Sequence, residues 1–72
     1  MGISKAVKML LVENSMKQND LAEAFKMTKQ TMSNKVVAER WSGKDLLKVA
    51  TLTGCELAFI LPDGRKIVIE NE

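Results

Sequence analysis

The chain contains no histidine and one cysteine, and its apolar runs are short. Without histidine it lacks the side chain that most often serves as a general base or a zinc ligand. Cys55 alone cannot form an internal disulfide bond. Apolar runs such as residues 9–12 are far shorter than the roughly 18 residues that cross a bilayer. We therefore expect a soluble, cytoplasmic protein that binds no membrane, metal or other cofactor and has no enzymatic activity.

The length of 72 residues allows one small globular domain. A domain of this size buries only roughly 60% of the surface that its unfolded chain exposes, so its core is small. A second copy of the chain would extend that core, and two-fold dimers are the commonest assemblies of this kind. The length therefore favours a homodimer.

The basic residues gather in the first part of the chain. Residues 1–40 carry seven basic and four acidic side chains, a net charge of +3, whereas residues 41–72 carry four basic and five acidic ones, a net charge of −1. Residues 26–40 contain Lys26, Lys29, Lys35 and Arg40, with Glu39 as their only acid. Such a stretch can bind the phosphates of a nucleic acid, or it can simply be the solvated face of a helix.

Apolar residues recur at spacings of three and four along the first 54 residues, which predicts helices. Ser4 is available to cap the first helix, and Thr28 is a good N-cap for the third. Ser42 and Asp45 have the spacing of a capping box, and Gly54 ends the run that follows them. The predicted helices cover about residues 4–13, 18–25, 29–37 and 42–53.

Two apolar segments, residues 57–61 and 67–69, flank the turn Pro62-Asp63-Gly64-Arg65 and predict a β-hairpin. Proline presets the first turn angle, the Asp63 side chain bonds the backbone, and Gly64 accepts a positive φ, as in a type I turn followed by a glycine bulge. Both faces of the first strand are apolar, and an isolated hairpin is marginal in water. We expect one face to pack on the helices and the other face, or an edge, to contact a second protomer. The alternative is a hairpin folded wholly onto its own helices.

Together these patterns predict a mainly α fold with a small β element. Four to five short helices in residues 1–54 precede the hairpin of residues 55–72, within a single domain. The residues expected at the dimer interface are Phe59, Ile60, Ile67, Val68 and Ile69.

The second and third predicted helices are joined only by residues 26–28, and so short a connection makes them cross steeply, as in a helix-turn-helix. The surrounding sequence is Met16-Lys17-Gln18-Asn19-Asp20-Leu21-Ala22, then Phe25-Lys26-Met27-Thr28-Lys29-Gln30-Thr31-Met32-Ser33. Over residues 3–54 the chain resembles the Cro and phage-repressor (XRE) family of bacterial DNA-binding proteins, and its hairpin looks like the strands through which Cro dimerises. Two residues depart from the family pattern. Lys26 stands where glycine is common in the turn, and Lys35 stands where an apolar residue is usual.

The resemblance implies that the third helix enters the major groove of DNA. It assigns base reading to Lys29, Gln30, Ser33 and Asn34. It assigns phosphate contacts to Gln18, Lys26, Thr31, Lys35 and Arg40. Glutamine and asparagine can bond bidentately to adenine, and lysine can donate to guanine, so the side chains suit the task. The alternative is that Gln30 and Asn34 are ordinary exposed residues of a surface helix.

Three further residues are assigned to packing or to no function. We expect Met32 in the core, because methionine fills irregular gaps. We expect Trp41 to be partly buried beside the fourth helix, and Cys55 to be an inert buried thiol.

The sequence thus predicts a transcriptional regulator, most simply a repressor of phage, plasmid or bacterial type. It would bind an inverted repeat in double-stranded DNA as a homodimer. The alternative is a protein-interaction module, such as an antirepressor or an antitoxin, whose hairpin binds a protein partner.

Overall fold

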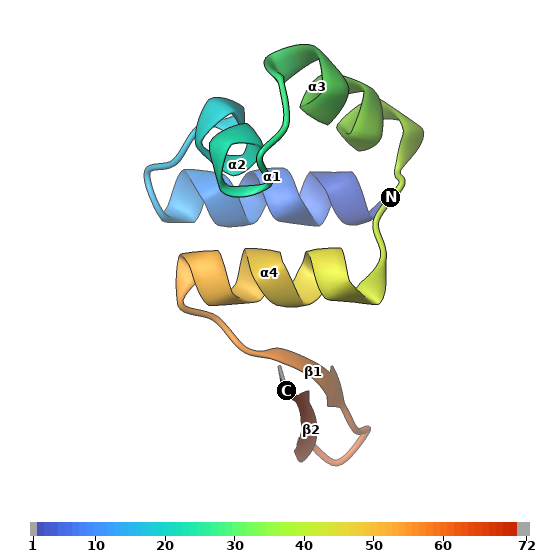
Figure 1. The fold of residues 1–72 in the computed structure, drawn as a ribbon. Helices are drawn as coiled ribbons and strands as arrows, with labels where there is room; N and C mark the ends of the chain where they lie inside the picture. Colours follow the sequence, from blue (N-terminus) through green and yellow to red (C-terminus); the bar gives the residue numbers. More distant parts are fainter. Residues whose placement is uncertain (1, 71–72) are drawn as a thin grey trace.

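The computed structural model describes residues 2–70. Within them lie four helices, α1 (Ile3–Glu13), α2 (Gln18–Ala24), α3 (Lys29–Ala38) and α4 (Gly43–Thr53), and two strands, β1 (Leu57–Ile60) and β2 (Lys66–Ile69). The helices cluster together, and the hairpin projects beyond α4, on the side away from α2 and α3 (Figure 1). The predicted class, a mainly α fold followed by a hairpin, is confirmed.

Short-range signals set most of the helix ends. The Thr28 hydroxyl accepts a hydrogen bond from the backbone N–H of Thr31 at 3.1 Å and so caps α3. Ser42 Oγ accepts from the backbone N–H of Asp45 at 3.1 Å, while the Asp45 carboxylate accepts from that of Ser42 at 2.9 Å, which completes the predicted capping box of α4. Gly54 ends α4 in the left-handed region, with a φ of 71°.

Ser4 does not cap α1, and that prediction is wrong. The helix begins at Ile3 after Gly2, so Ser4 lies inside it and is buried. Its Oγ donates a hydrogen bond to the backbone carbonyl of Val36 at 2.6 Å and accepts one from Nε1 of Trp41 at 2.8 Å. Ser4 therefore ties α1 to the end of α3 and to the chain that follows it.

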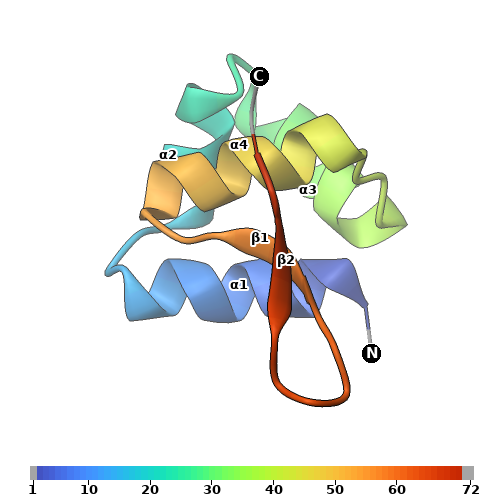
Figure 2. The same cartoon turned by 90° about the horizontal axis from the view of Figure 1, so that it is seen from below.

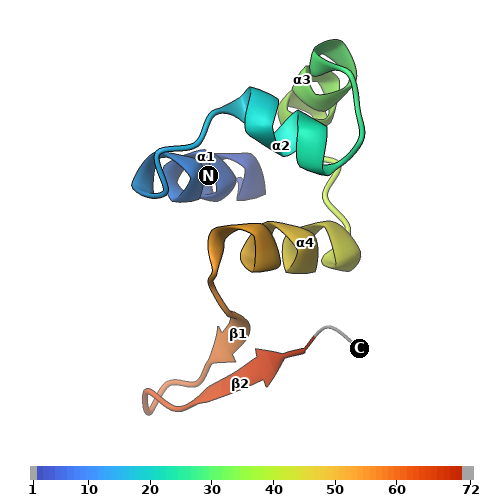
Figure 3. The same cartoon turned by 60° about the vertical axis from the view of Figure 1, so that its left-hand side comes forward.

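The core lies between α1, α2, α3 and α4. Leu21 of α2 and Met32 of α3 are fully buried at its centre, which confirms the position expected for Met32. The buried residues around them are Val7, Leu11, Ala22, Phe25, Val36 and Val49. Trp41 is partly buried against this cluster, as expected, and its ring meets that of Phe25 edge-on at 6.5 Å between centroids. Helices α1 and α4 lie side by side and contact each other (Figure 3).

The hairpin has the predicted antiparallel pairing and turn. Leu57 is opposite Ile69, and Phe59 is opposite Ile67. The backbone N–H of Gly64 donates to the carbonyl of Leu61 at 2.9 Å, and Gly64 has a φ of 93°.

The hairpin packs less on the helices than expected. Leu57, at the start of β1, reaches an apolar groove between α1 and α4 that is also lined by Ile3, Leu10 and Leu46. No residue of β1 or β2 is buried, and Phe59 and Ile67, on the same face as Leu57, are mostly exposed. The expectation that one face packs on the helices therefore holds for Leu57 but not for the rest of that face. Only three residues, 54–56, separate α4 from β1, which leaves the rest of the hairpin extended below α1 and α4 (Figure 2).

Cys55 is exposed, which contradicts the expected buried thiol. It belongs to the same short connection after α4, outside the core. Across residues 2–70, no helix has the length and apolar character needed to cross a membrane.

Candidate DNA-binding site

The turn between α2 and α3 holds the two helices in a crossed arrangement (Figures 1 and 3). The backbone N–H of Met27 bonds the carbonyl of Ala22 at 2.9 Å, and Lys26 has a φ of 55°. A glycine would adopt this left-handed conformation without strain, whereas a lysine does so at a cost. Lys26, which stands where the family commonly has glycine, adopts the left-handed conformation, and α2 and α3 keep their crossed arrangement.

Helix α3 has one buried side and one exposed side. Met32 and Val36 point into the core, whereas Gln30 and Asn34 are exposed on the opposite side. The Gln30 side-chain amide donates to the Asn34 side-chain carbonyl at 3.0 Å. The bond holds the two amides side by side, while Gln30 Oε1 and the Asn34 amide N–H groups remain available to a ligand. The exposed side of α3 therefore offers a hydrogen-bond acceptor on Gln30 and donors on Asn34.

The other predicted base-reading residues flank this amide pair. Lys29 is exposed in the first turn of α3, and Ser33 is half-buried where the helix meets the core. The structure therefore places all four predicted readers on one helix, with Gln30 and Asn34 at the centre of its exposed side.

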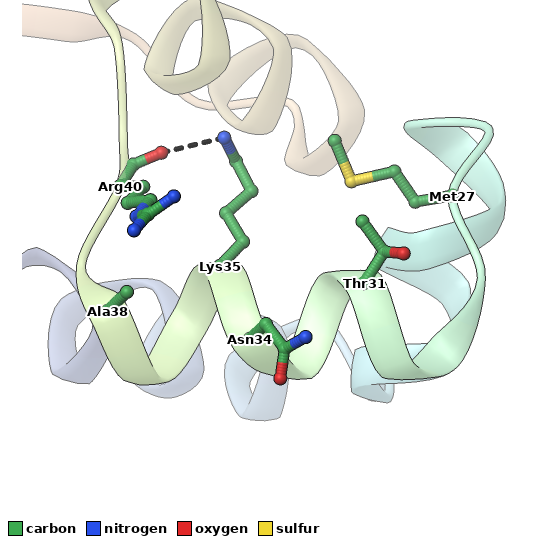
Figure 4. Close-up of a pocket in the computed structure, with 6 residues that line it drawn as sticks. All are labelled: Met27, Thr31, Asn34, Lys35, Ala38 and Arg40. Atoms are coloured by element: carbon green, nitrogen blue, oxygen red, sulfur yellow. Dashed lines mark hydrogen bonds between the residues drawn. The ribbon is translucent and has the colours of Figure 1, made fainter.

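A groove runs beside α3, toward the chain that leaves the helix. It is lined by Met27, Thr31, Asn34, Lys35, Ala38 and Arg40 (Figure 4). Three of the predicted phosphate contacts, Thr31, Lys35 and Arg40, line this groove, and of these Thr31 and Arg40 are exposed. Lys26 is exposed in the turn, and Gln18 is half-buried as the first residue of α2.

Lys35 differs from the other predicted phosphate contacts, because its ammonium group is turned inward. Nζ lies 2.7 Å from the backbone carbonyl oxygen of Arg40 and 2.7 Å from an Asp45 carboxylate oxygen, and the side chain is only 15% exposed. Figure 4 shows it turned toward the Arg40 carbonyl, away from Asn34. Desolvation by burial opposes ionisation of Asp45, yet the hydrogen bonds from Lys35 and Ser42 lower the pKa of its carboxyl group below the ordinary value.

Glu39 closes α3 in a second left-handed conformation, with a φ of 57°. Its carboxylate accepts a hydrogen bond from the backbone N–H of Ser4 at 2.7 Å, and the hydrogen bonds from Ser4 lower the pKa of the Glu39 carboxyl group. Sequence reasoning missed this contact, because 35 residues separate its two partners and no local spacing signals it.

Sequence reasoning also missed the apolar residues at the exposed end of α3. Val37 is 81% exposed, and Ala38 beside it is exposed as well. Val37 lies three residues after Asn34 and seven after Gln30, a spacing that brings the three to one side of a helix. That spacing was visible in the sequence.

The residues predicted for a dimer interface lie apart from α3, on the hairpin. Phe59, Ile60 and Ile67 are 66%, 77% and 57% exposed, Val68 is 36% exposed, and Ile69 is half-buried. The register places Phe59 and Ile67 on one face, with Ile60 and Val68 on the other. Both faces of the hairpin therefore present apolar side chains to solvent.

A sequence model of the Cro/C1-type helix-turn-helix DNA-binding domain matches residues 6–61. The match covers most of the chain, from within α1 through α2, α3, α4 and β1, and the protein belongs to this family of DNA-binding domains. No curated protein and no solved structure matches the chain.

Proposed function

We propose that this protein is a transcriptional repressor that recognises an inverted-repeat operator in duplex DNA through α3. One observation carries the proposal: the exposed side of α3, at the point where a helix-turn-helix meets the major groove, presents the hydrogen-bonded amides of Gln30 and Asn34. Amides of this kind pair with adenine at N6 and N7. A protein bound at the operator would block polymerase. We propose that this occurs in the cytoplasm.

The base readers in this proposal are Lys29, Gln30, Ser33 and Asn34. Selection from a random duplex pool at near-physiological salt should enrich one inverted repeat. Gln30→Ala and Asn34→Ala should each relax the preference at one position of the half-site, by about 1–3 kcal/mol of discrimination. Thr51→Ala, at an exposed polar residue of α4, is the control and should leave the preference intact. An unchanged preference in both α3 variants would refute the assignment.

Phosphate contacts come from Gln18, Lys26, Thr31 and Arg40 in this proposal. Because each neutralised phosphate releases counterions, Arg40→Gln should lower the dependence of log affinity on log salt by about one unit. Lys35→Gln provides the contrast, since its ammonium group is held by Asp45 and the Arg40 carbonyl. We assign Lys35 to holding α3 in place, so Lys35→Gln should lower stability without this loss of salt dependence. If both variants lose the same amount of salt dependence, Lys35 also contacts a phosphate.

We propose further that the hairpin of residues 55–72 joins two copies of the chain. Its four exposed apolar side chains on two faces, and the unpaired edges of a two-stranded sheet, support this assembly. Two such protomers would present their α3 helices to half-sites about 34 Å apart. Ile60 is 77% exposed, so Ile60→Asp should leave each protomer folded, and the variant should sediment as a monomer. Val12→Asp, at a comparably exposed valine of α1, should leave assembly unchanged. A dimer that survives Ile60→Asp would refute the interface.

The same exposed hairpin favours a second candidate, a module that captures a protein partner such as a toxin by strand pairing. The selection experiment separates the two. Enrichment of an inverted repeat supports the repressor, whereas folded protein that enriches no sequence supports the interaction module.

A further inference from the structure

The outer side of α3 carries an apolar side chain that neither the core nor the polar contacts of the helix use. Val37 is 81% exposed, more than the other large apolar residues in the described part of the chain. It lies on the same side of the helix as Gln30 and Asn34, about two turns after Gln30 and one turn after Asn34. It is therefore continuous with the surface proposed to read DNA.

The major groove offers one apolar group on its base edges, the C5 methyl group of thymine. An exposed valine beside base-reading residues can pack against this methyl group. We propose that Val37 contacts a thymine methyl group and thereby selects thymine at one position of each half-site. The inference rests on the proposed function, because it requires α3 to lie in the major groove.

The spacing along α3 indicates where that thymine lies. Gln30 and Val37 are seven residues apart, which corresponds to about 10 Å along a helix axis. Base pairs are stacked about 3.4 Å apart, so a helix that follows the groove places Val37 about three base pairs from the one that Gln30 reads. The thymine should therefore lie within the half-site.

Replacement of thymine by deoxyuridine removes the methyl group and leaves the hydrogen-bonding edges of the base pair unchanged. In a scan of the selected operator, wild-type protein should lose about fourfold affinity per half-site at one position, the change expected for one buried methyl group. Val37→Ala should bind the thymine operator more weakly, and the difference between thymine and deoxyuridine at that position should vanish. Discrimination at the positions read by Gln30 and Asn34 should remain.

The control is Val12→Ala, because Val12 is 75% exposed on α1 and lies away from α3. This variant should retain the full effect of deoxyuridine. A double-mutant cycle over protein and DNA then isolates the contact between side chain and methyl group. Circular dichroism checks that both variants fold.

Two results would overturn the inference and leave the proposed function standing. In the first, deoxyuridine affects wild-type protein and Val37→Ala equally at every position. In the second, Val37→Ala weakens binding to all sequences by the same factor, which identifies a contact with the sugar-phosphate backbone. If no duplex sequence is enriched at all, the proposed function itself fails.

Discussion

Replacement of Ser4 by alanine tests the link between α1 and α3. The change deletes the hydroxyl that donates to the Val36 carbonyl and accepts from the Trp41 indole N–H. Two hydrogen bonds at about 1 kcal/mol each are lost, and a half-buried indole N–H is left without its partner, so we expect a loss of about 2–3 kcal/mol in the free energy of unfolding. For a domain of this size, whose total stability is about 4–11 kcal/mol, the loss is large.

The assay is urea denaturation, followed by circular dichroism at one protein concentration so that any dimer contributes equally. The matched control is Ser33→Ala. Ser33 is also inside a helix, and it forms no hydrogen bond among the described residues, so both variants gain the same helix propensity. With a slope of about 1 kcal/mol per molar urea, Ser4→Ala should unfold about 2–3 M below the control. Coincident midpoints would refute the reasoning, because they would mean that the buried hydroxyl contributes nothing.

Two further predictions concern strain and charge. Lys26→Gly should raise the free energy of unfolding by about 1 kcal/mol, because glycine adopts the left-handed conformation without strain, and Ser15→Gly, at a φ of 54°, should do the same. Only Lys26→Gly should weaken DNA binding. Equal binding by the two variants would contradict the phosphate contact of Lys26. Because folding lowers the pKa of Asp45, its carboxylate stabilises the fold above its ordinary pKa of 3.8, and this contribution is lost as the pH falls through the lowered value. Asp45→Asn should therefore destabilise at neutral pH and approach wild-type stability in acid, as measured by urea midpoints across pH; a difference that stays constant would refute this.

The features predicted correctly from the sequence are those whose causes lie within a few residues. The cap formed by Thr28, the box formed by Ser42 and Asp45, and the turn at Gly64 each depend on neighbours one to three positions away. The apolar spacing of Leu21 and Met32 likewise located the core. Local patterns were sufficient for the helices, the hairpin and the exposed side of α3.

The errors share a different cause. Ser4 was expected to cap its own helix, but its partners Val36 and Trp41 are 32 and 37 residues away. A serine near a helix start has the same local pattern whether it caps the helix or crosses the core. One face of the hairpin was expected to pack on the helices, but Leu57 reaches them while Phe59 and Ile67 on the same face stay exposed, and the alternation of apolar residues does not signal this difference.

The long-range contacts converge on α3. Its beginning is held by the turn after α2, and its end is tied to α1 through Ser4 and Glu39. Lys35, in its last turn, links it to Asp45 at the start of α4. Lys35 stands where the family usually has an apolar residue, yet it still points inward, because Asp45 and the Arg40 carbonyl satisfy its charge there. A binding surface works only when its side chains are held close to their productive geometry by the residues behind them. Ser4, Lys35 and Glu39 therefore hold the orientation of α3, and in the proposed function we expect them to act on DNA recognition as positioning residues.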